Sequence, residues 1–419
     1  MNEAARETDV LVIGGGPAGM MAAIRAAMRG RSVVLLEKNQ RVGAKLDITG
    51  GGRCNIANDE PDVRALLSRY GDASEFLFSA FARFGLPEAR TFFESRGMPL
   101  VTQARQRMFP KSEHAPAVTK LLKKAMQESG VAVETDMRVT ELSLSDDGSI
   151  ATVTCADGTR FAPHSVVLAT GGLSHPETGS TGDGFRWLAR LGHAVHEPNP
   201  SIVPLETDPS DDWIPQLAGT SLSFMKISFY SEGKRAFSKT GKLLFTHFGI
   251  SGPLILNSAK QVGDLLMNGP VAAAIDLYPD TEFDALERRV RAAFDANKNK
   301  EVKNLLPSIL PAGMANAIIA QHVIADVKTP VHSVTKEERR ALVHVMKALP
   351  LTIVGRMGMD RAVVSDGGVD LSEVDTRTFR SKKIPNLFLV GDILHISRPS
   401  GGYSLQLCWT SGAVAGDNA

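Results

Sequence analysis

The chain of 419 residues contains few cysteines and no long apolar run. Its three cysteines, Cys54, Cys155 and Cys408, lie far apart and form neither a C-x-x-C pair nor a metal-ligand spacing. This pattern indicates a reducing compartment, predicts no metal site and argues against a redox-active disulfide. No apolar stretch reaches the length of a membrane span, and the polar N-terminus predicts no signal peptide. We therefore expect a cytoplasmic protein with no membrane partner.

An excess of charge of one sign is also lacking. Lys and Arg total 47 against 46 Asp and Glu, which leaves a net charge of +1. Proteins that bind nucleic acid usually carry a strongly basic surface. We therefore expect a small-molecule substrate and no nucleic-acid partner, and the balance disfavours an enzyme that modifies nucleic acid. The sequence carries no signal for an oligomeric state. With 43% hydrophobic residues, the chain is long enough for more than one domain.

The first motif joins a short strand to a helix through glycines. Residues 9–13 read as a short buried strand that runs into Gly14-x-Gly16-x-x-Gly19, and a helical pattern follows over residues 17–28. In this motif the first glycine allows the tight turn, the second lets the backbone approach a pyrophosphate, and the third lets helix and strand pack closely. The phosphates would lie on the free amides of the helix N-terminus. The predicted binding residues are Gly14, Gly16, Pro17, Ala18 and Gly19.

An acidic residue ends the second apolar strand. Glu37 follows residues 32–36 and lies eighteen residues after Gly19. Its carboxylate can accept hydrogen bonds from both hydroxyls of an adenosine ribose, whereas a 2′-phosphate would meet a like charge. The predicted nucleotide at this site is therefore FAD or NAD rather than NADP, with Glu37 and Lys38 among its contacts.

A glycine loop favours FAD over NAD. Residues 41–55, R-V-G-A-K-L-D-I-T-G-G-G-R-C-N, match neither a strand nor a helix. Three consecutive glycines can adopt positive φ and lie against a flat ring, while Lys45 and Arg53 can pair with a negatively charged group. A NAD dehydrogenase needs no such loop after its second strand. The predicted contacts are Lys45, Thr49, Gly50, Gly51, Gly52, Arg53, Cys54 and Asn55.

Two distant strands and a final helix complete the predicted cofactor site. Residues 165–172 form a buried strand pattern ending in Thr-Gly, and residues 386–392 form another ending in Gly-Asp, whose acid can hold ribityl hydroxyls. A Gly-Gly turn then opens a helix whose amides would face the pyrimidine edge of the flavin. The added contacts are Ala169, Thr170, Gly171, Gly391, Asp392, Gly401, Gly402, Tyr403 and Gln406. In this order the segments predict FAD.

The motifs together resemble one family of bacterial flavoproteins. The matching segments are G-G-G-P-A-G (14–19), T-G-G-G-R-C-N (49–55), R-M-F-P-K-S (107–112), T-G-G-L-S-H-P-E-T-G-S-T-G-D-G (170–184), L-L-F-T-H-F-G-I-S-G-P (243–253), G-G-V-D-L-S-E-V-D (367–375) and S-G-G-Y-S-L-Q (400–406). The chain is similar to the NAD(P)/FAD-dependent oxidoreductases that include an aminoacetone-oxidase-like branch and a proposed bile-acid reductase. The resemblance implies that Val139 presents its backbone to the adenine. Where members commonly carry Gly-Glu and Gly-Tyr-Thr, this chain has Gly391-Asp392 and Arg398-Pro399-Ser400.

The predicted fold class is α/β, a Rossmann-type two-dinucleotide-binding FAD domain with an inserted β-barrel-like unit and a helical unit. Residues 1–192 and 359–419 would form the discontinuous FAD domain. Hairpin patterns and a proline-rich exit predict a β-rich domain over 193–250 and 349–358. Apolar residues at three- and four-residue spacing predict a helical domain over 251–348. The resemblance implies the same three-part layout.

Four side chains are candidates for chemistry, each with a structural alternative. The predicted catalytic residues are His247, as acid, base or substrate anchor, and Cys54, whose thiolate Arg53 and loop amides could stabilise. His247 could instead be satisfied within a domain interface, and Cys54 could simply be a small residue that fits close to the ring. His175 is interpreted as structural. Arg398 either anchors an anionic substrate or is solvated.

The sequence favours an FAD-dependent oxidoreductase that exchanges a hydride between flavin N5 and a small metabolite. No second glycine fingerprint is present, so NADH or NADPH, if used, would visit the flavin transiently. Two alternatives stay open: an oxygen-using amine or aminoketone oxidase, and a non-catalytic flavin-binding protein.

Overall fold

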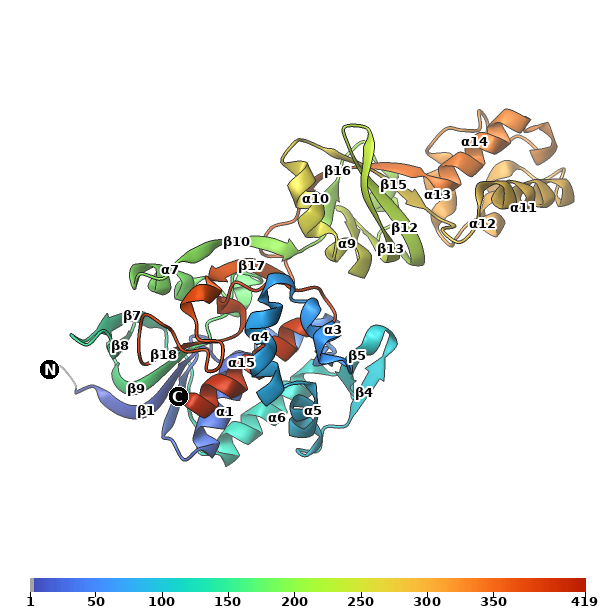
Figure 1. Ribbon diagram of the computed structural model, residues 1–419. Helices are drawn as coiled ribbons and strands as arrows, with labels where there is room; N and C mark the ends of the chain where they lie inside the picture. Colours follow the sequence, from blue (N-terminus) through green and yellow to red (C-terminus); the bar gives the residue numbers. More distant parts are fainter. Residues whose placement is uncertain (1–3) are drawn as a thin grey trace. The chain divides into compact units, whose positions relative to one another are not determined.

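The structure is a computed structural model that describes residues 4–419. It divides into two compact units (Figure 1). The first extends to Pro200 and includes Val363–Ala419, and the second is Ser201–Ala362. The predicted fold class is confirmed, because the first unit is a Rossmann-type α/β domain and the second combines a closed barrel with helices. Among residues 4–419, no helix combines the length and the apolar character needed to cross a membrane.

The first unit is built on a seven-stranded sheet of order β6-β2-β1-β9-β8-β7, with β18 paired to β9. The parallel strands are β1 (Arg6–Ile13), β2 (Val33–Leu36), β6 (Ala132–Glu134), β9 (Arg160–Leu168) and β18 (Leu387–Leu389). The meander β7 (Val139–Leu144) and β8 (Ile150–Cys155) extends it antiparallel. Val10, Leu11 and Val12 are fully buried, which explains why β1 reads as an unbroken apolar run.

Helices α1 (Pro17–Met28) and α15 (Tyr403–Asn418) pack against each other in this unit (Figure 1). A Cβ atom at Gly412 would lie 2.3 Å from Ala18 O, and one at Gly416 would lie 2.3 Å from Ala22 O. Small residues on α15 therefore allow the two helix backbones to approach. The other helices of the unit are α2 (Thr49–Gly52), α3 (Val63–Ser68), α4 (Ser74–Arg83), α5 (Leu86–Glu94), α6 (Ala115–Glu128) and α7 (Asp183–Arg190).

Two smaller sheets complete the first unit. One has the order β3-β5-β4, with β3 (Ala57–Asn58), β4 (Leu100–Gln103) and β5 (Arg107–Pro110). The other pairs β10 (Val195–Ile202) with β17 (Val364–Val369). Residues 193–200 were expected in the inserted β-rich domain, but this pairing keeps them with the FAD domain.

The second unit contains a closed barrel of order β11-β14-β13-β12-β15-β16. Its strands are β11 (Leu205–Thr207), β12 (Ser221–Ser231), β13 (Lys234–Thr246), β14 (Gly249–Ser251), β15 (Val271–Asp276) and β16 (Leu349–Arg356). β12 and β13 form the expected hairpin, whose turn residues Glu232 and Gly233 both have positive φ. β15 lies inside the range 251–348 that was expected to be helical. That expectation was wrong here because the Ala-rich sequence of β15 has little of the alternation that predicts a strand.

The helices of the second unit share one hydrophobic core with the barrel. They are α8 (Trp213–Gln216), α9 (Pro253–Leu256), α10 (Ala259–Leu266), α11 (Phe283–Ala296), α12 (Val302–Ile309), α13 (Met314–Ile319) and α14 (Lys336–Lys347). Barrel and helical residues therefore bury their apolar faces together rather than as two separate domains.

Candidate functional site

The carboxyl ends of the parallel strands bring the predicted cofactor segments together in the first unit. Gly14, directly after β1, has φ +111, and a Cβ there would lie 2.4 Å from the carbonyl oxygen of Ala169 after β9. A Cβ at Gly391, after β18, would lie 3.0 Å from the Ala18 side chain on α1. Segments almost 400 residues apart in sequence thus meet at one edge of the sheet, where open α/β sheets bind ligands.

The glycines of the first turn have different structural roles. A Cβ at Gly19 would lie 2.0 Å from Gly14 O, so this glycine is required for packing. Gly16 caps α1 in an extended conformation with φ −78°, and a Cβ there would meet nothing within 4 Å. The space over Gly16 therefore leaves the first amides of α1 accessible to an anion such as a pyrophosphate.

The carboxylate of Glu37 is positioned by backbone amides. Its Oε2 accepts a hydrogen bond from Gly15 N (2.8 Å) and its Oε1 accepts one from Asn39 N (2.9 Å). Burial raises the pKa of Glu37, while these two amides act to lower it. Lys38 forms an ion pair of 2.7 Å with Asp183 on α7, and its contact with the cofactor stays a prediction.

The glycine loop contains two defined turns. Its centre is a 3₁₀ turn at Leu46–Ile48 followed by a turn at Thr49–Gly52, in which Gly50, Gly51 and Gly52 have φ +58°, +67° and +81°. The positive φ of the three glycines is as predicted, because glycine adopts it without strain, but the bounds of the two turns could not be predicted since the segment has no apolar periodicity.

Cys54 ends this loop in an environment that disfavours a thiolate. It is fully buried, adopts φ +60°, and burial raises the pKa of its thiol to about 12. The thiol is therefore protonated at neutral pH. This favours the interpretation of Cys54 as a small packed residue over that of a nucleophile.

A buried charge cluster lies at the end of β18. Arg398, only 4% exposed, pairs with Asp392 and donates through Nε to Ser404 Oγ (3.0 Å). The expectation of a solvated Arg398 is therefore wrong, and its role as a substrate anchor stays a prediction. Lys45 donates to Ser174 Oγ (3.2 Å), and its pKa is lowered by burial although Asp392 acts to raise it.

The start of α15 is held by the small sheet. A Cβ at Gly402 would lie 2.3 Å from the carbonyl carbon of Ala57 on β3. Asn55, with its amide oriented to satisfy both ends, accepts from Gly402 N (2.9 Å) and donates to Met108 O (3.2 Å). Tyr403 is buried and its carbonyl accepts from the Tyr70 hydroxyl (2.8 Å). The glycine pair is therefore required first for packing on β3.

Three buried polar atoms provide a test of whether the site fits FAD. Asn58 Oδ1, Thr170 Oγ1 and Gln406 Oε1 have no hydrogen-bond partner within the described part of the chain. Thr170 and Gln406 belong to segments predicted to contact FAD. Buried acceptors are normally satisfied, and FAD carries hydroxyl and ring N–H donors. Together with the free amides of α1, these atoms fit the cofactor.

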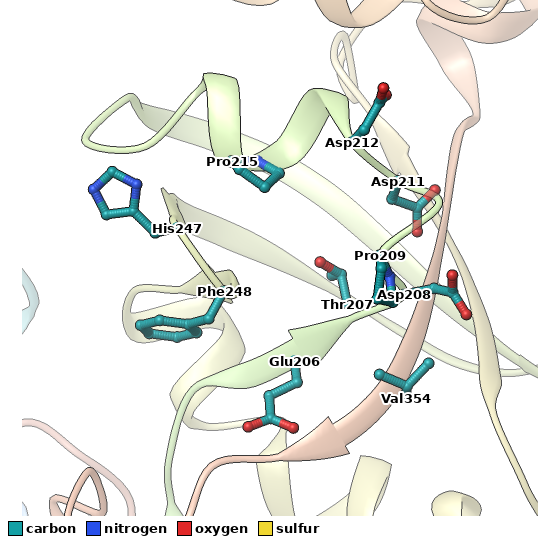
Figure 2. A pocket seen from close by; sticks show the side chains of 10 residues that line it. All are labelled: Glu206, Thr207, Asp208, Pro209, Asp211, Asp212, Pro215, His247, Phe248 and Val354. Carbon is teal, nitrogen blue, oxygen red and sulfur yellow. The ribbon is translucent and has the colours of Figure 1, made fainter.

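His247 lines a cavity of about 480 Å³ in the second unit (Figure 2). His247 and Phe248 come from the turn between β13 and β14 and lie on one side of it, whereas Asp208, Asp211 and Asp212 lie on the other. Burial raises the pKa of Asp211. Among residues 4–419, no group of three or more His, Cys, Asp and Glu side chains has an arrangement suited to a metal ion. A role of His247 in catalysis stays a prediction.

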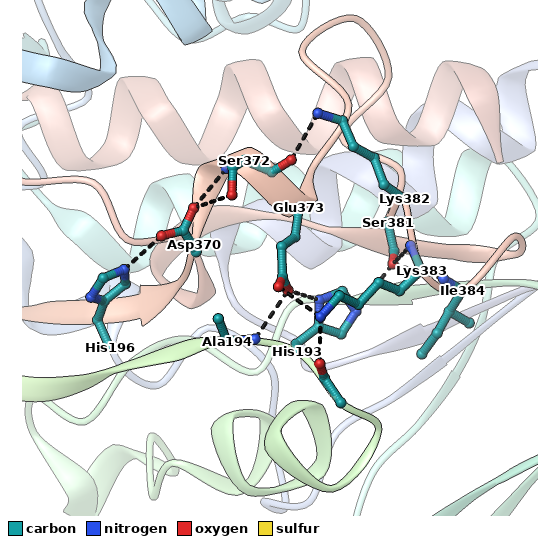
Figure 3. Close-up of polar contacts among 11 residues, drawn as sticks. His193, Ala194, His196, Asp370, Ser372, Glu373, Ser381, Lys382, Lys383 and Ile384 are labelled. Carbon is teal, nitrogen blue, oxygen red and sulfur yellow. Dashed lines mark hydrogen bonds and ion pairs between the residues drawn. The ribbon is translucent and has the colours of Figure 1, made fainter.

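A cluster that sequence reasoning missed has the geometry of a serine–histidine–acid relay (Figure 3). Ser381 Oγ lies 3.1 Å from His193 Nε2, and His193 Nδ1 lies 2.8 Å from Glu373 Oε2. Ser381 Oγ also accepts from the amides of Lys383 (3.0 Å) and Ile384 (2.9 Å), and both Ser381 and His193 are buried. The serine is therefore a turn cap rather than an exposed nucleophile. His193 is 180 residues from Glu373 and 188 residues from Ser381 in the sequence, so no local motif predicts the cluster.

The other two predicted positions have clear local roles. His175 adopts φ +51° and its Nδ1 lies 2.8 Å from Glu177 Oε1, which agrees with a structural role. Val139 begins β7 and pairs with Cys155. Its contact with the adenine stays a prediction.

Comparison with known proteins gives consistent matches over the whole chain. The family model "HI0933-like protein Rossmann domain" matches residues 8–418. The chain is 29% identical to a 3-dehydro-bile acid delta(4,6)-reductase of Clostridium scindens over 97% of both chains, and 27% identical to a ribosomal RNA dihydrouridine synthase of Haemophilus influenzae over 96% of both. Among solved structures, it resembles 3-ketosteroid-delta4-(5alpha)-dehydrogenase from Rhodococcus jostii with a TM-score of 0.52 and 17% identity, covering 100% of this chain and 97% of that one. This last similarity concerns the fold alone.

Proposed function

Because the chain belongs to the family of HI0933-like protein Rossmann domains and is an FAD-dependent oxidoreductase, we propose that it reduces a carbon–carbon double bond conjugated to a carbonyl group. The proposal names a reaction class and treats the scaffold that carries the double bond as variable. It makes the chain a reductase rather than an oxygen-using amine or aminoketone oxidase.

The observation that carries this proposal is a chemistry shared by two relatives with different substrates. One is named for reducing delta(4,6) double bonds of a 3-dehydro bile acid, in which a ketone lies next to the unsaturated carbons. The other is named for making dihydrouridine, which is uridine with one ring double bond saturated beside a carbonyl. Both relatives align with this chain over almost its full length, so the shared reaction class is the simplest one to extend to it.

The residues of the first unit support this chemistry by holding and polarising the cofactor. The chemistry that FAD supplies when bound is hydride transfer. Glu37 would hold the adenosine ribose and the α1 amides the pyrophosphate. Lys45 and Arg398 place two cations around the single carboxylate of Asp392, which favours negative charge on a neighbouring group. A nicotinamide nucleotide is the proposed electron donor.

The test is an anaerobic half-reaction experiment on FAD-loaded protein. The flavin is first reduced with NADPH or NADH, and the reduced protein is mixed with a 3-oxo steroid that has a conjugated double bond, or with a uridine oligonucleotide. We expect rapid return of the oxidised flavin spectrum and a product heavier by two hydrogens with at least one of these acceptors. Reoxidation by oxygen alone, together with flavin reduction by an aminoketone, would instead identify an oxidase.

A further inference from the structure

Three arginines at the small sheet of the first unit lie close enough to interact electrostatically. Arg53 lies in the glycine loop, whereas Arg105 lies in the turn between β4 and β5 and Arg107 begins β5. The guanidinium carbon of Arg53 lies 4.5 Å from the centre of the Phe109 ring, and that of Arg107 lies 5.7 Å from the same centre. Two of the three guanidinium groups thus lie beside the same aromatic ring.

The turn that presents these side chains has an unusual backbone. Arg105 and Gln106 are consecutive non-glycine residues with φ +61° and +56°. Such conformations cost on the order of 1–3 kcal/mol each and concentrate at functional sites. The turn is held in place because Asn58 Nδ2 donates to Arg105 O (3.2 Å) and Asp59 N donates to Gln106 O (2.6 Å).

The positive charge of the cluster is only partly neutralised. Burial, followed by the charges of Arg53 and Arg105, lowers the pKa of Arg107. Glu113 lies 3.6 Å from Arg53, while the nearby Asp59 is already paired with Arg90 at 2.6 Å. Within residues 4–419, Glu113 is therefore the one carboxylate that forms an ion pair with any of the three arginines, and Arg107 Nε donates to the carbonyl oxygen of Ala104 (3.1 Å).

The cluster is tied to the edge of the candidate FAD site. Asn58 Nδ2, which holds the arginine turn, also donates to Gly401 O (3.1 Å) at the start of α15. A Cβ at Gly50 in the glycine loop would lie 3.5 Å from the Phe109 ring. A ligand held by the arginines would consequently lie beside segments that are predicted to contact the cofactor.

We propose that Arg53, Arg105 and Arg107 form a phosphate-binding site, and that its ligand is the 2′-phosphate of NADPH as the electron donor. Guanidinium groups bind phosphate oxygens in pairs. Three such groups against one carboxylate match a phosphate monoester dianion better than a carboxylate or a phosphodiester, each of which carries a single charge. Glu37 opposes a 2′-phosphate at the FAD site, so an NADPH donor needs its phosphate bound elsewhere. The inference rests on the proposed function only for the use of a nicotinamide donor.

The binding test uses the FAD-loaded full chain, kept anaerobic with its flavin already reduced by dithionite so that no hydride is transferred. Isothermal titration calorimetry is then performed with adenosine 2′,5′-bisphosphate, adenosine 5′-monophosphate, NADPH and NADH. We expect the wild type to bind the bisphosphate and NADPH more tightly than the monophosphate and NADH. Arg105→Asn and Arg107→Gln should each weaken bisphosphate and NADPH binding by about tenfold or more, as for loss of a charged hydrogen bond. Asparagine tolerates left-handed φ, so Arg105→Asn should keep the fold.

The matched control is Arg64→Gln, which removes one exposed arginine on α3 of the same unit. It should bind the phosphate ligands as the wild type does. Unchanged binding in both cluster variants would overturn the proposal, as would a wild type that does not distinguish NADPH from NADH. A uridine oligonucleotide is titrated in parallel, and its loss of binding in the cluster variants with NADPH binding intact would overturn the assignment to NADPH and identify RNA phosphate as the ligand. Since binding is measured without turnover, inactivity toward conjugated acceptors would refute the proposed function alone.

Discussion

At the residue scale, the candidate site depends on groups that the backbone itself positions. Glu37 is only 8% exposed, and each of its carboxylate oxygens accepts a hydrogen bond from a backbone amide. Such a carboxylate is oriented before a ligand arrives, and it keeps lone pairs that ribose hydroxyls can use. Its geometry therefore does not depend on a flexible side-chain partner.

Replacing Glu37 by alanine should weaken FAD binding by about 1.5–3 kcal/mol, because charge-assisted hydrogen bonds to the ribose are lost. The measurement is the FAD dissociation constant of folded apoprotein, followed by flavin fluorescence. Glu134→Ala is the matched control, since Glu134 ends the neighbouring strand β6 and pairs with Arg6 instead. Wild-type affinity in Glu37→Ala would show that this carboxylate does not bind the cofactor.

The cysteines provide a second prediction at this scale. All three are buried, and burial raises the pKa of the thiol to about 12 in Cys54 and to about 11 in Cys155. Because the thiolate is the reactive form, alkylation by iodoacetamide at neutral pH should be much slower in the folded protein than in urea. Mass spectrometry of timed samples measures this. Rapid labelling of Cys54 in the native state would restore it as a candidate nucleophile.

At the element scale, the contact between α1 and α15 supports the nucleotide turn. α15 is buried along almost its whole length, and its small residues allow α1 to pack closely, which fixes the start of α1 where the pyrophosphate is expected. The hydrogen bond from Gly391 N to Ser411 Oγ (3.0 Å) ties the end of β18 to the same helix. α15 is therefore a scaffold for two cofactor segments at once.

Gly416→Ala should destabilise the protein by about 1–3 kcal/mol, because the new Cβ would lie 2.3 Å from Ala22 O and force the helices apart. Urea unfolding of the apoprotein measures the change. Gly16→Ala is the contrasting variant, since its Cβ meets no protein atom within 4 Å. It should unfold like the wild type yet bind FAD more weakly. If Gly416→Ala were as stable as the wild type, the close approach of the helices would be wrong.

At the scale of the whole molecule, the second unit is an insertion with its own core. Its first and last strands, β11 and β16, pair with each other, and Met357 N donates to Pro204 O (3.1 Å) near its two ends. The barrel and the helices bury one continuous set of apolar side chains. Short, paired ends and a separate core are what an independently folding insertion requires.

Residues 201–362 expressed alone should therefore fold cooperatively, with a single thermal transition in circular dichroism. The remaining chain, with a short Gly-Ser linker joining Pro200 to Val363, should still bind FAD, since the predicted contacts lie in the first unit. Wild-type FAD affinity in this variant is the expected result. A linked first unit that folds but no longer binds FAD would place essential contacts in the insertion.

Local sequence patterns predicted several elements closely. Proline at the first helical position and the glycine turn before it set the start of α1, and its bounds match the predicted 17–28. The hairpin of β12 and β13 was likewise visible in its alternating residues and turn. The Ala-rich strand β15 was missed, because its sequence lacks the alternation of a strand, whereas the glycines of the turn at Thr49–Gly52 adopt positive φ as predicted.

By itself, the sequence determined the dinucleotide site, because strand, glycine turn, helix and acid lie within 37 residues and interact locally. The class of fold also follows from local sequence, since the strand–turn–helix pattern of β1 and α1 and the hairpin pattern of β12 and β13 match their elements. The surroundings of Arg398, of His193, and of Arg53 and Arg107 beside Phe109 became visible only in the folded structure. The environments of these side chains come from segments that meet only when the chain folds. The burial and the charge pairing of these side chains depend on contacts between distant segments, and no local sequence pattern encodes those contacts.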